Sequence, residues 1–244
     1  MKRTVHVVAI AAALCAQSAH ADPDDYVATP AVEYGEREIE LRFGTASKSG
    51  AERLSAASLA FGYGVTPWWA TEVYGKFNRA GGASTHFDAV EWENKFQLTE
   101  PGQYFVDLGL LVELEYPQDR AEGYELRLGP LLQKDFGRVQ VNTNFLLERH
   151  YRATEPEVTE LGYQWQVKYR WREDFEFGAQ GFGDMGQWDR WDAAHDQKHT
   201  LGPAIFGKIN LGGRQALRYD AAYLFKASSA APDRTLRMQL EYEF

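Results

Sequence analysis

Cysteine is nearly absent from this sequence, and so are long apolar segments and any excess of basic residues. The 244 residues include one cysteine, Cys15, so a framework of disulfides within the chain is excluded. Beyond residue 21, no apolar run approaches the roughly 18 residues of a transmembrane helix, which excludes a helical membrane protein. A transmembrane β-barrel is not excluded, because only every second strand residue faces lipid and mean hydropathy, here −0.47, stays low. Lysine and arginine number 26 against 35 acids, and this net charge of −9 argues against a nucleic-acid partner.

The first 21 residues have the pattern of a secretory signal peptide. Two basic residues open the chain, an apolar stretch follows over residues 5–16, and Ala19-His20-Ala21 resembles a cleavage site. The apolar stretch is short for a membrane anchor, which is the alternative interpretation. A lipoprotein signal is disfavoured because Leu14 precedes the cysteine where a small residue is expected. We therefore predict export with removal of residues 1–21.

Residues 22–37 differ from the rest of the chain in composition. They contain two prolines and several acids, and they lack the regular alternation that begins after them. We expect this segment to be a flexible periplasmic lead-in to the folded domain, which would cover residues 38–244.

From residue 38 onward, apolar and polar residues alternate in segment after segment. In residues 236–244 every even-numbered residue is apolar and every odd-numbered residue is polar. Strand side chains point alternately to two faces, so this pattern predicts a strand with one apolar and one polar face. Eleven earlier segments show the same period. We therefore predict an all-β fold, a transmembrane antiparallel up-and-down β-barrel of about 12 strands.

The connections between these segments alternate in length. Short turns are expected at residues 66–67, 99–102, 136–137, 173–174 and 212–213. Longer loops are expected at residues 46–53, 80–85, 117–123, 150–158, 186–198 and 227–234. Outer-membrane barrels have short periplasmic turns and longer outer loops, which is the same alternation.

A soluble exported β-sandwich or a lipocalin-like barrel would show similar alternation. Such a fold would have to bury the many charges of the polar face, whereas a membrane barrel places them around a lumen. The apolar face is rich in Leu, Tyr and Trp with almost no charge, which favours contact with lipid.

The polar face predicts a charged, water-filled lumen. Acids recur two residues apart, as at Glu91 and Glu93, with bases available as partners across strands. Paired carboxylates also occur in glycosidases, but the mixture with bases favours a lumen wall. Asp107 is expected near mid-strand beside Glu91 and Glu93, at a constriction. The candidate lumen residues are Glu91, Glu93, Lys95, Asp107, Glu113, Glu115, Arg127, Lys168 and Arg170.

The end of the chain resembles the C-terminal β-signal of Gram-negative outer-membrane barrel proteins. The residues that carry this resemblance are Leu236, Met238, Leu240, Tyr242 and Phe244. Residues 63–68 and 91–96 also resemble parts of uncharacterised proteobacterial barrel proteins. The resemblance implies an outer-membrane location, assembly by the barrel assembly machinery, and contact with outer-membrane lipid and lipopolysaccharide. It implies no substrate.

One loop concentrates residues that can bind metals. From Asp184 to His199 the chain carries four aspartates and two histidines, with Trp188 and Trp191 among them. These groups suit a divalent cation, but no EF-hand or HExxH pattern is present. We interpret the segment as a solvated loop and leave cation binding open.

The expected function is a narrow channel for passive passage of small solutes. The predicted inward-facing residues comprise 14 acids and 10 bases, which indicates a mild cation preference. Two alternatives stay open: a lipid-modifying hydrolase of the outer membrane, and a structural or surface-binding barrel without conductance. No catalytic residue, metal ligand or cofactor is assigned from the sequence.

Overall fold

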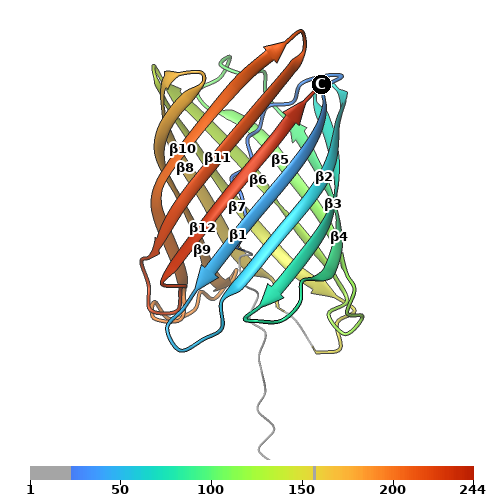
Figure 1. The fold of residues 1–244 in the computed structure, drawn as a ribbon, viewed down its shortest axis with the longest axis vertical. Helices are drawn as coiled ribbons and strands as arrows, with labels where there is room; N and C mark the ends of the chain where they lie inside the picture. The colour runs from blue at the N-terminus through green and yellow to red at the C-terminus, as the bar shows by residue number, and fades with distance from the viewer. Residues whose placement is uncertain (1–22, 156–157) are drawn as a thin grey trace, which may run out of the picture.

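Twelve β-strands form a closed antiparallel barrel in the computed structural model, which describes residues 23–155 and 158–244 (Figure 1). Each strand pairs with its neighbours in the chain, and β1 pairs with β12 to close the barrel. The predicted 12-stranded up-and-down barrel is confirmed. The predicted signal peptide lies outside the described residues. The strands are β1 (Arg37–Ser47), β2 (Leu54–Thr66), β3 (Trp69–Ala80), β4 (His86–Gln97), β5 (Asp107–Pro117), β6 (Tyr124–Phe136), β7 (Val139–Tyr151), β8 (Glu160–Arg172), β9 (Phe175–Gln187), β10 (Lys198–Gly212), β11 (Gln215–Lys226) and β12 (Arg234–Glu243).

The barrel has a turn end and a loop end. At the turn end, β1 begins, β12 ends, and four of the five connections span two residues. The exception joins β4 to β5 through residues 98–106 and is longer than the sequence predicts. At the loop end, the six connections are longer, as predicted. Figure 1 shows the C-terminus at the turn end and the longer loops at the opposite end.

Strand β1 illustrates how alternation sorts side chains between the two faces. Ile39 and Leu41 are each 45% exposed on the outside, whereas Glu40 and Arg42 between them are 3% and 5% exposed inside. The register continues this arrangement across the closure, where Leu41 lies opposite Leu240 of β12. The outer surface is therefore apolar and the interior polar, the arrangement of a transmembrane barrel.

Among the described residues, no helix is long and apolar enough to span a membrane.

Aromatic side chains gather on the outside at the turn end. Phe96 stacks against both Trp68 and Trp69, with ring centroids 6.3 and 6.4 Å apart. Tyr242 and Phe244 stack at 5.6 Å. Such a belt is typical of the level where a membrane barrel meets the headgroups.

Candidate functional site: the barrel lumen

The structure places the nine sequence-predicted lumen residues at inward-facing strand positions. Glu91, Glu93 and Glu113 are the most enclosed, with at most 4% of each residue exposed. The Arg170 side chain, near the turn end, is 37% exposed and binds Asp135 at 2.8 Å.

Asp107 does not lie at a constriction. The sequence places it near mid-strand, whereas β5 begins at Asp107, at the turn end. Its Oδ1 accepts a hydrogen bond of 2.7 Å from the backbone N–H of Gly102 in the preceding turn. The difference arises because Tyr104 and Phe105 look like strand residues in the sequence but are exposed in the turn, at 63% and 83%.

Two bases hold the acids of strands β4 and β5 in place. Lys76 Nζ lies 3.3 Å from Glu91 Oε2 and 2.5 Å from Glu115 Oε2. Arg127 binds Glu113 on the neighbouring strand and reaches Asp25, 3.2 Å away, from the segment before β1. Buried charges in this wall are therefore largely paired, which limits the cost of removing them from water.

Arg42 of β1 is the centre of a second network. Its guanidinium donates to Glu40 and to the Tyr74 hydroxyl, and it lies 3.5 Å from Glu93 Oε2. The same group lies over the rings of Tyr26 and Tyr74, at 3.4 and 4.1 Å from their centroids. Cation–π contacts of this kind contribute about 2 kcal/mol or more where the partners are desolvated.

The wall formed by β6 to β9 carries a row of hydrogen-bonded amides at mid-height. Asn142 Nδ2 donates to Gln133 at 2.9 Å, Gln166 donates to Asn142 at 3.0 Å, and Gln180 donates to Gln166 at 3.2 Å. Arg237 of β12 extends this row by donating to Gln180. The sequence places these residues on the polar face but gives no sign that they form one connected row.

Residues 23–36 lie inside the barrel, visible in Figure 1 as a blue trace in the lumen. Ser58 donates to Asp24 at 2.5 Å, Asn144 donates to the Ala28 carbonyl at 3.1 Å, and the Val32 N–H donates to Gln97 at 2.9 Å. These partners lie progressively nearer the turn end. The segment, which we call the internal segment, therefore runs along the lumen before the chain enters β1.

The sequence predicts a flexible periplasmic lead-in at residues 22–37, and the structure differs. Tyr26, Val27 and Ala28 are at most 7% exposed. Tyr26 and Ala28 pack with Leu111, Leu131 and Leu146 of the wall. Val27 packs on the other side with Phe182, Phe206 and Leu224. These apolar positions on an otherwise polar inner face are the physical reason that the segment is held, because burial removes apolar surface from water.

Glycines in the wall give the internal segment room. A Cβ at Gly44 would lie 1.9 Å from the Pro23 carbonyl oxygen, and one at Gly64 would lie 1.9 Å from the Glu33 carbonyl oxygen. The backbone at Gly64 also exchanges two hydrogen bonds with the segment, to Gly35 and Glu36, of 2.8 and 2.9 Å. Inward-facing glycines in polar strands were the sequence signal that could have revealed a chain packed against them.

The internal segment separates two cavities of very different size. The larger, about 420 Å³, opens toward the turn end and is lined by charged residues that include Glu38, Glu72, Lys95 and Glu241. The smaller, about 50 Å³, lies toward the loop end beside Pro23, Phe182 and Arg237.

The five residues of the predicted β-signal lie on the outer side of β12 and at its end. Leu236 and Met238 are 38% and 39% exposed, and Phe244 is 37% exposed. The Phe244 N–H donates to the Arg37 carbonyl at 2.8 Å, so the last residue is joined to the start of β1. Tyr242 and Leu240 complete the row opposite Ile39 and Leu41.

The loop that the sequence marks as rich in aspartate and histidine spreads these groups among different partners. Asp184 pairs with Lys198 at 3.3 Å, and His195 lies 3.2 Å from Asp196 at the surface. His199 bonds to the Tyr163 hydroxyl at 2.9 Å. Within the described residues, the groups that could share a metal ion lie elsewhere, on the lumen wall and at the turn end.

No protein-family model matches the chain, and no curated protein matches its sequence. Solved structures of outer-membrane barrels do match. The NanC porin has a TM-score of 0.56 at 13% identity, covering 84% of this chain and 98% of that chain. An outer membrane channel from Pseudomonas putida F1 has a TM-score of 0.55 at 15% identity, covering 91% and 98%. The KdgM porin, in complex with disordered oligogalacturonate, has a TM-score of 0.54 at 8% identity, covering 85% and 98%. At these identities the likeness shows the fold.

Proposed function

We propose that this chain is a bacterial outer-membrane channel for passive passage of small solutes, with a mild preference for cations. The observation that carries the proposal is a closed barrel with an apolar outside and a charged lumen, which holds a cavity of about 420 Å³ open toward the turn end. A lumen lined by charges is typical of a water-filled passage, because charges that are removed from water destabilise a fold unless they are paired. The porin and channel folds of the similar structures support the same conclusion.

The lumen favours cations or neutral solutes over acidic ones. The internal segment carries Asp24, Asp25, Glu33 and Glu36 and no base, so it adds to the acidic excess of the wall. The KdgM porin was solved with an oligogalacturonate, which is a polyanion. A polyanion would meet like charge here, and we therefore propose a different solute class for this chain.

The internal segment closes the channel in this conformation. It fills the middle of the lumen, and its backbone is hydrogen-bonded to the wall from Asn144 to Gly64. Passage then requires the segment to move aside. The apolar anchors are few, Tyr26, Val27 and Ala28 with the buried Pro30, and burying a side chain such as valine contributes about 1.5–3 kcal/mol.

Export by a cleaved signal peptide, assembly through the C-terminal β-signal and contact with lipopolysaccharide belong to this proposal. The enzyme alternative has less support. In the part of the chain that the structure describes, the four histidine rings contact carboxylates, a backbone carbonyl, Tyr163 and Gln197, and none is hydrogen-bonded to a serine hydroxyl that it could activate.

Conductance of purified protein in planar bilayers tests the proposal. We compare the natural sequence with a variant in which residues 24–34 are replaced by a glycine–serine segment of equal length. The variant should conduct severalfold more, because it keeps the chain connection but loses the anchors of the internal segment. A heat-modifiable band on electrophoresis establishes that both proteins are folded. Two folded barrels without conductance would favour the structural alternative, and equal conductance would contradict closure by the segment.

A further inference from the structure

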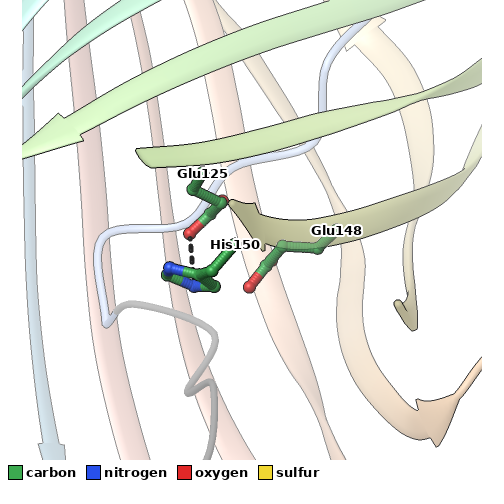
Figure 2. A group of neighbouring side chains, drawn as sticks. All are labelled: Glu125, Glu148 and His150. Atoms are coloured by element: carbon green, nitrogen blue, oxygen red, sulfur yellow. Dashed lines mark ion pairs between the residues drawn. The ribbon is translucent and has the colours of Figure 1, made fainter. Parts of the chain in front are cut away.

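Three side chains that can bind a metal converge on the lumen wall near the loop end. Figure 2 shows Glu125 of β6 with Glu148 and His150 of β7. Glu125 lies directly opposite His150 in the strand register, and Glu148 precedes His150 by two residues on the same face. One potential ligand atom from each residue lies within 4.8 Å of the other two.

The ring of His150 is held in the orientation of a metal ligand. Its Nδ1 lies 3.2 Å from the backbone carbonyl of Glu122, to which the Nδ1–H donates. The ring nitrogen that carries the lone pair is therefore Nε2, which lies 3.3 Å from Glu125 Oε2. A histidine that binds metal usually donates its other ring N–H in this way, often to a backbone carbonyl.

The spacing of the two facing atoms matches a shared cation. An imidazole lone pair and a carboxylate oxygen repel each other unless a proton or a metal lies between them. Two ligands at about 2.0–2.1 Å from a tetrahedral zinc lie about 3.3–3.4 Å apart. The observed 3.3 Å fits that arrangement, and Glu148 supplies a third ligand from a long, rotatable side chain.

The strand register supplies an independent reason for a cation at this place. Glu125 lies opposite Glu115 of β5, and Glu148 lies opposite Glu160 of β8. Like charges directly opposite each other destabilise a sheet. Lys76 binds Glu115 at 2.5 Å, and Arg127, which lies opposite Glu148, also binds Glu113 and Asp25. A bound dication beside His150 would add positive charge among these acids.

We propose that Glu125, Glu148 and His150 bind a divalent transition metal of the zinc class near the loop end of the lumen. The mixed ligand set favours such a metal over calcium, because calcium sites are built from oxygen ligands alone. The side chains of His150 and Glu125 are 19% and 17% exposed, so the site is half-buried and a metal can enter from the lumen. The site stands independently of whether the lumen conducts.

Calorimetric titration of Zn²⁺ into the folded, chelator-stripped barrel at pH 7.5 tests the proposal. We expect one Zn²⁺ per chain, and a loss of affinity of about tenfold or more in His150→Ala and in the double variant Glu125→Gln/Glu148→Gln. His86→Ala is the matched control, because His86 Nε2 also lies near an acid, 3.8 Å from Asp88, but is not part of a three-residue group. Its affinity should equal that of the natural sequence.

A second measurement needs no variant. Diethyl pyrocarbonate modifies free imidazole, and peptide mass spectrometry reads the modification of each histidine separately. Zn²⁺ should protect His150 and leave the modification of His86 unchanged. No Zn²⁺ bound by the natural sequence, equal affinity in the His150 variant, or no protection of His150 would each overturn the proposal and leave a protonated His150 paired with Glu125.

Discussion

Ile205 and Ile209 of β10 offer a matched test of the lipid-facing surface at the scale of single residues. Both are 42% exposed on the outer face, but Ile205 lies at mid-strand and Ile209 lies four residues closer to the turn end. Arginine on a lipid face costs about 2–4 kcal/mol at the bilayer midplane and about 0–1 kcal/mol near the interface. We therefore expect Ile205→Arg to lower the free energy of unfolding clearly more than Ile209→Arg.

Urea titration of the barrel in lipid vesicles, followed by tryptophan fluorescence, gives both free energies. Equal costs at the two positions would argue that this face does not contact lipid, as in a soluble barrel.

Glu36 makes the end of the internal segment, where the chain enters β1, sensitive to pH. Burial, with the nearby carboxylates of Glu33 and Glu243, raises the pKa of Glu36 from 4.5 to about 7. A raised carboxyl pKa means that the folded arrangement favours the protonated form, so its stabilisation is complete below pH 4.5 and is lost as pH rises through about 7. The contacts between this end of the segment and the barrel wall should therefore weaken between pH 6 and pH 8.

Hydrogen exchange of the Gly35 amide, which donates to the Gly64 carbonyl, reports this change. After correction for intrinsic exchange, its protection should fall by roughly threefold over this range, a small value because Glu36 is partly exposed. Glu36→Gln should remove the pH dependence and keep the protection high. An unchanged pH response in that variant would assign the effect to another group.

At the scale of elements, β12 closes the barrel and carries the predicted β-signal. Deleting Phe244 removes the backbone N–H that donates to Arg37 and the ring that stacks on Tyr242. We expect less folded protein in the outer membrane, because the resemblance implies that assembly reads this residue. Phe244→Tyr is the control, since it keeps the ring and the backbone. The yield of the heat-modifiable band checks the prediction, and normal yield after deletion would contradict the sorting role.

The strands could be predicted because apolar and polar residues alternate along each of them, with the same two-residue period as the two faces of a strand. Strand β9 is rich in glycine and shows the alternation least clearly, and its structure shows why it is still a strand. The ring of Trp165 lies over Gly181, and that of Tyr163 lies over Gly183, so side chains of β8 cover the outer face that these glycines leave bare. Inward Phe182 then packs against Val27 of the internal segment.

The internal segment was not predictable by the same reasoning. Periodicity reports which face of a strand a residue occupies. Residues 23–36 are instead held by contacts with strands on every side of the lumen, which only the closed barrel brings together. Likewise, alternation predicts Glu125 on the polar face but leaves His150 in the loop expected at residues 150–158, and only the register shows that the two lie opposite each other.

At the scale of the whole molecule, the balance of charge in the lumen decides which ions pass. Most of the lumen bases form ion pairs, as Lys76 does with Glu91 and Glu115, so the electrostatic field of the lumen comes mainly from the acids in excess. Low-dielectric walls focus such a field and enrich counter-ions. The acids of the internal segment strengthen this effect. Any conductance should therefore favour cations.

Replacing Glu91 and Glu93 together by glutamine should weaken that preference. Both residues are at most 4% exposed on the lumen wall. The fold should tolerate the change, because Lys76 retains Glu115 and Arg42 retains Glu40 as partners. We expect the cation-to-anion permeability ratio, from reversal potentials in a salt gradient, to fall by roughly twofold. Glu52→Gln/Glu100→Gln removes the same charge from exposed connections at the two ends and should change the ratio less. Because the two variants have equal net charge, only a field set by charges inside the lumen separates them. A ratio that favours anions, or that responds equally to both variants, would contradict the proposed role of the lumen acids.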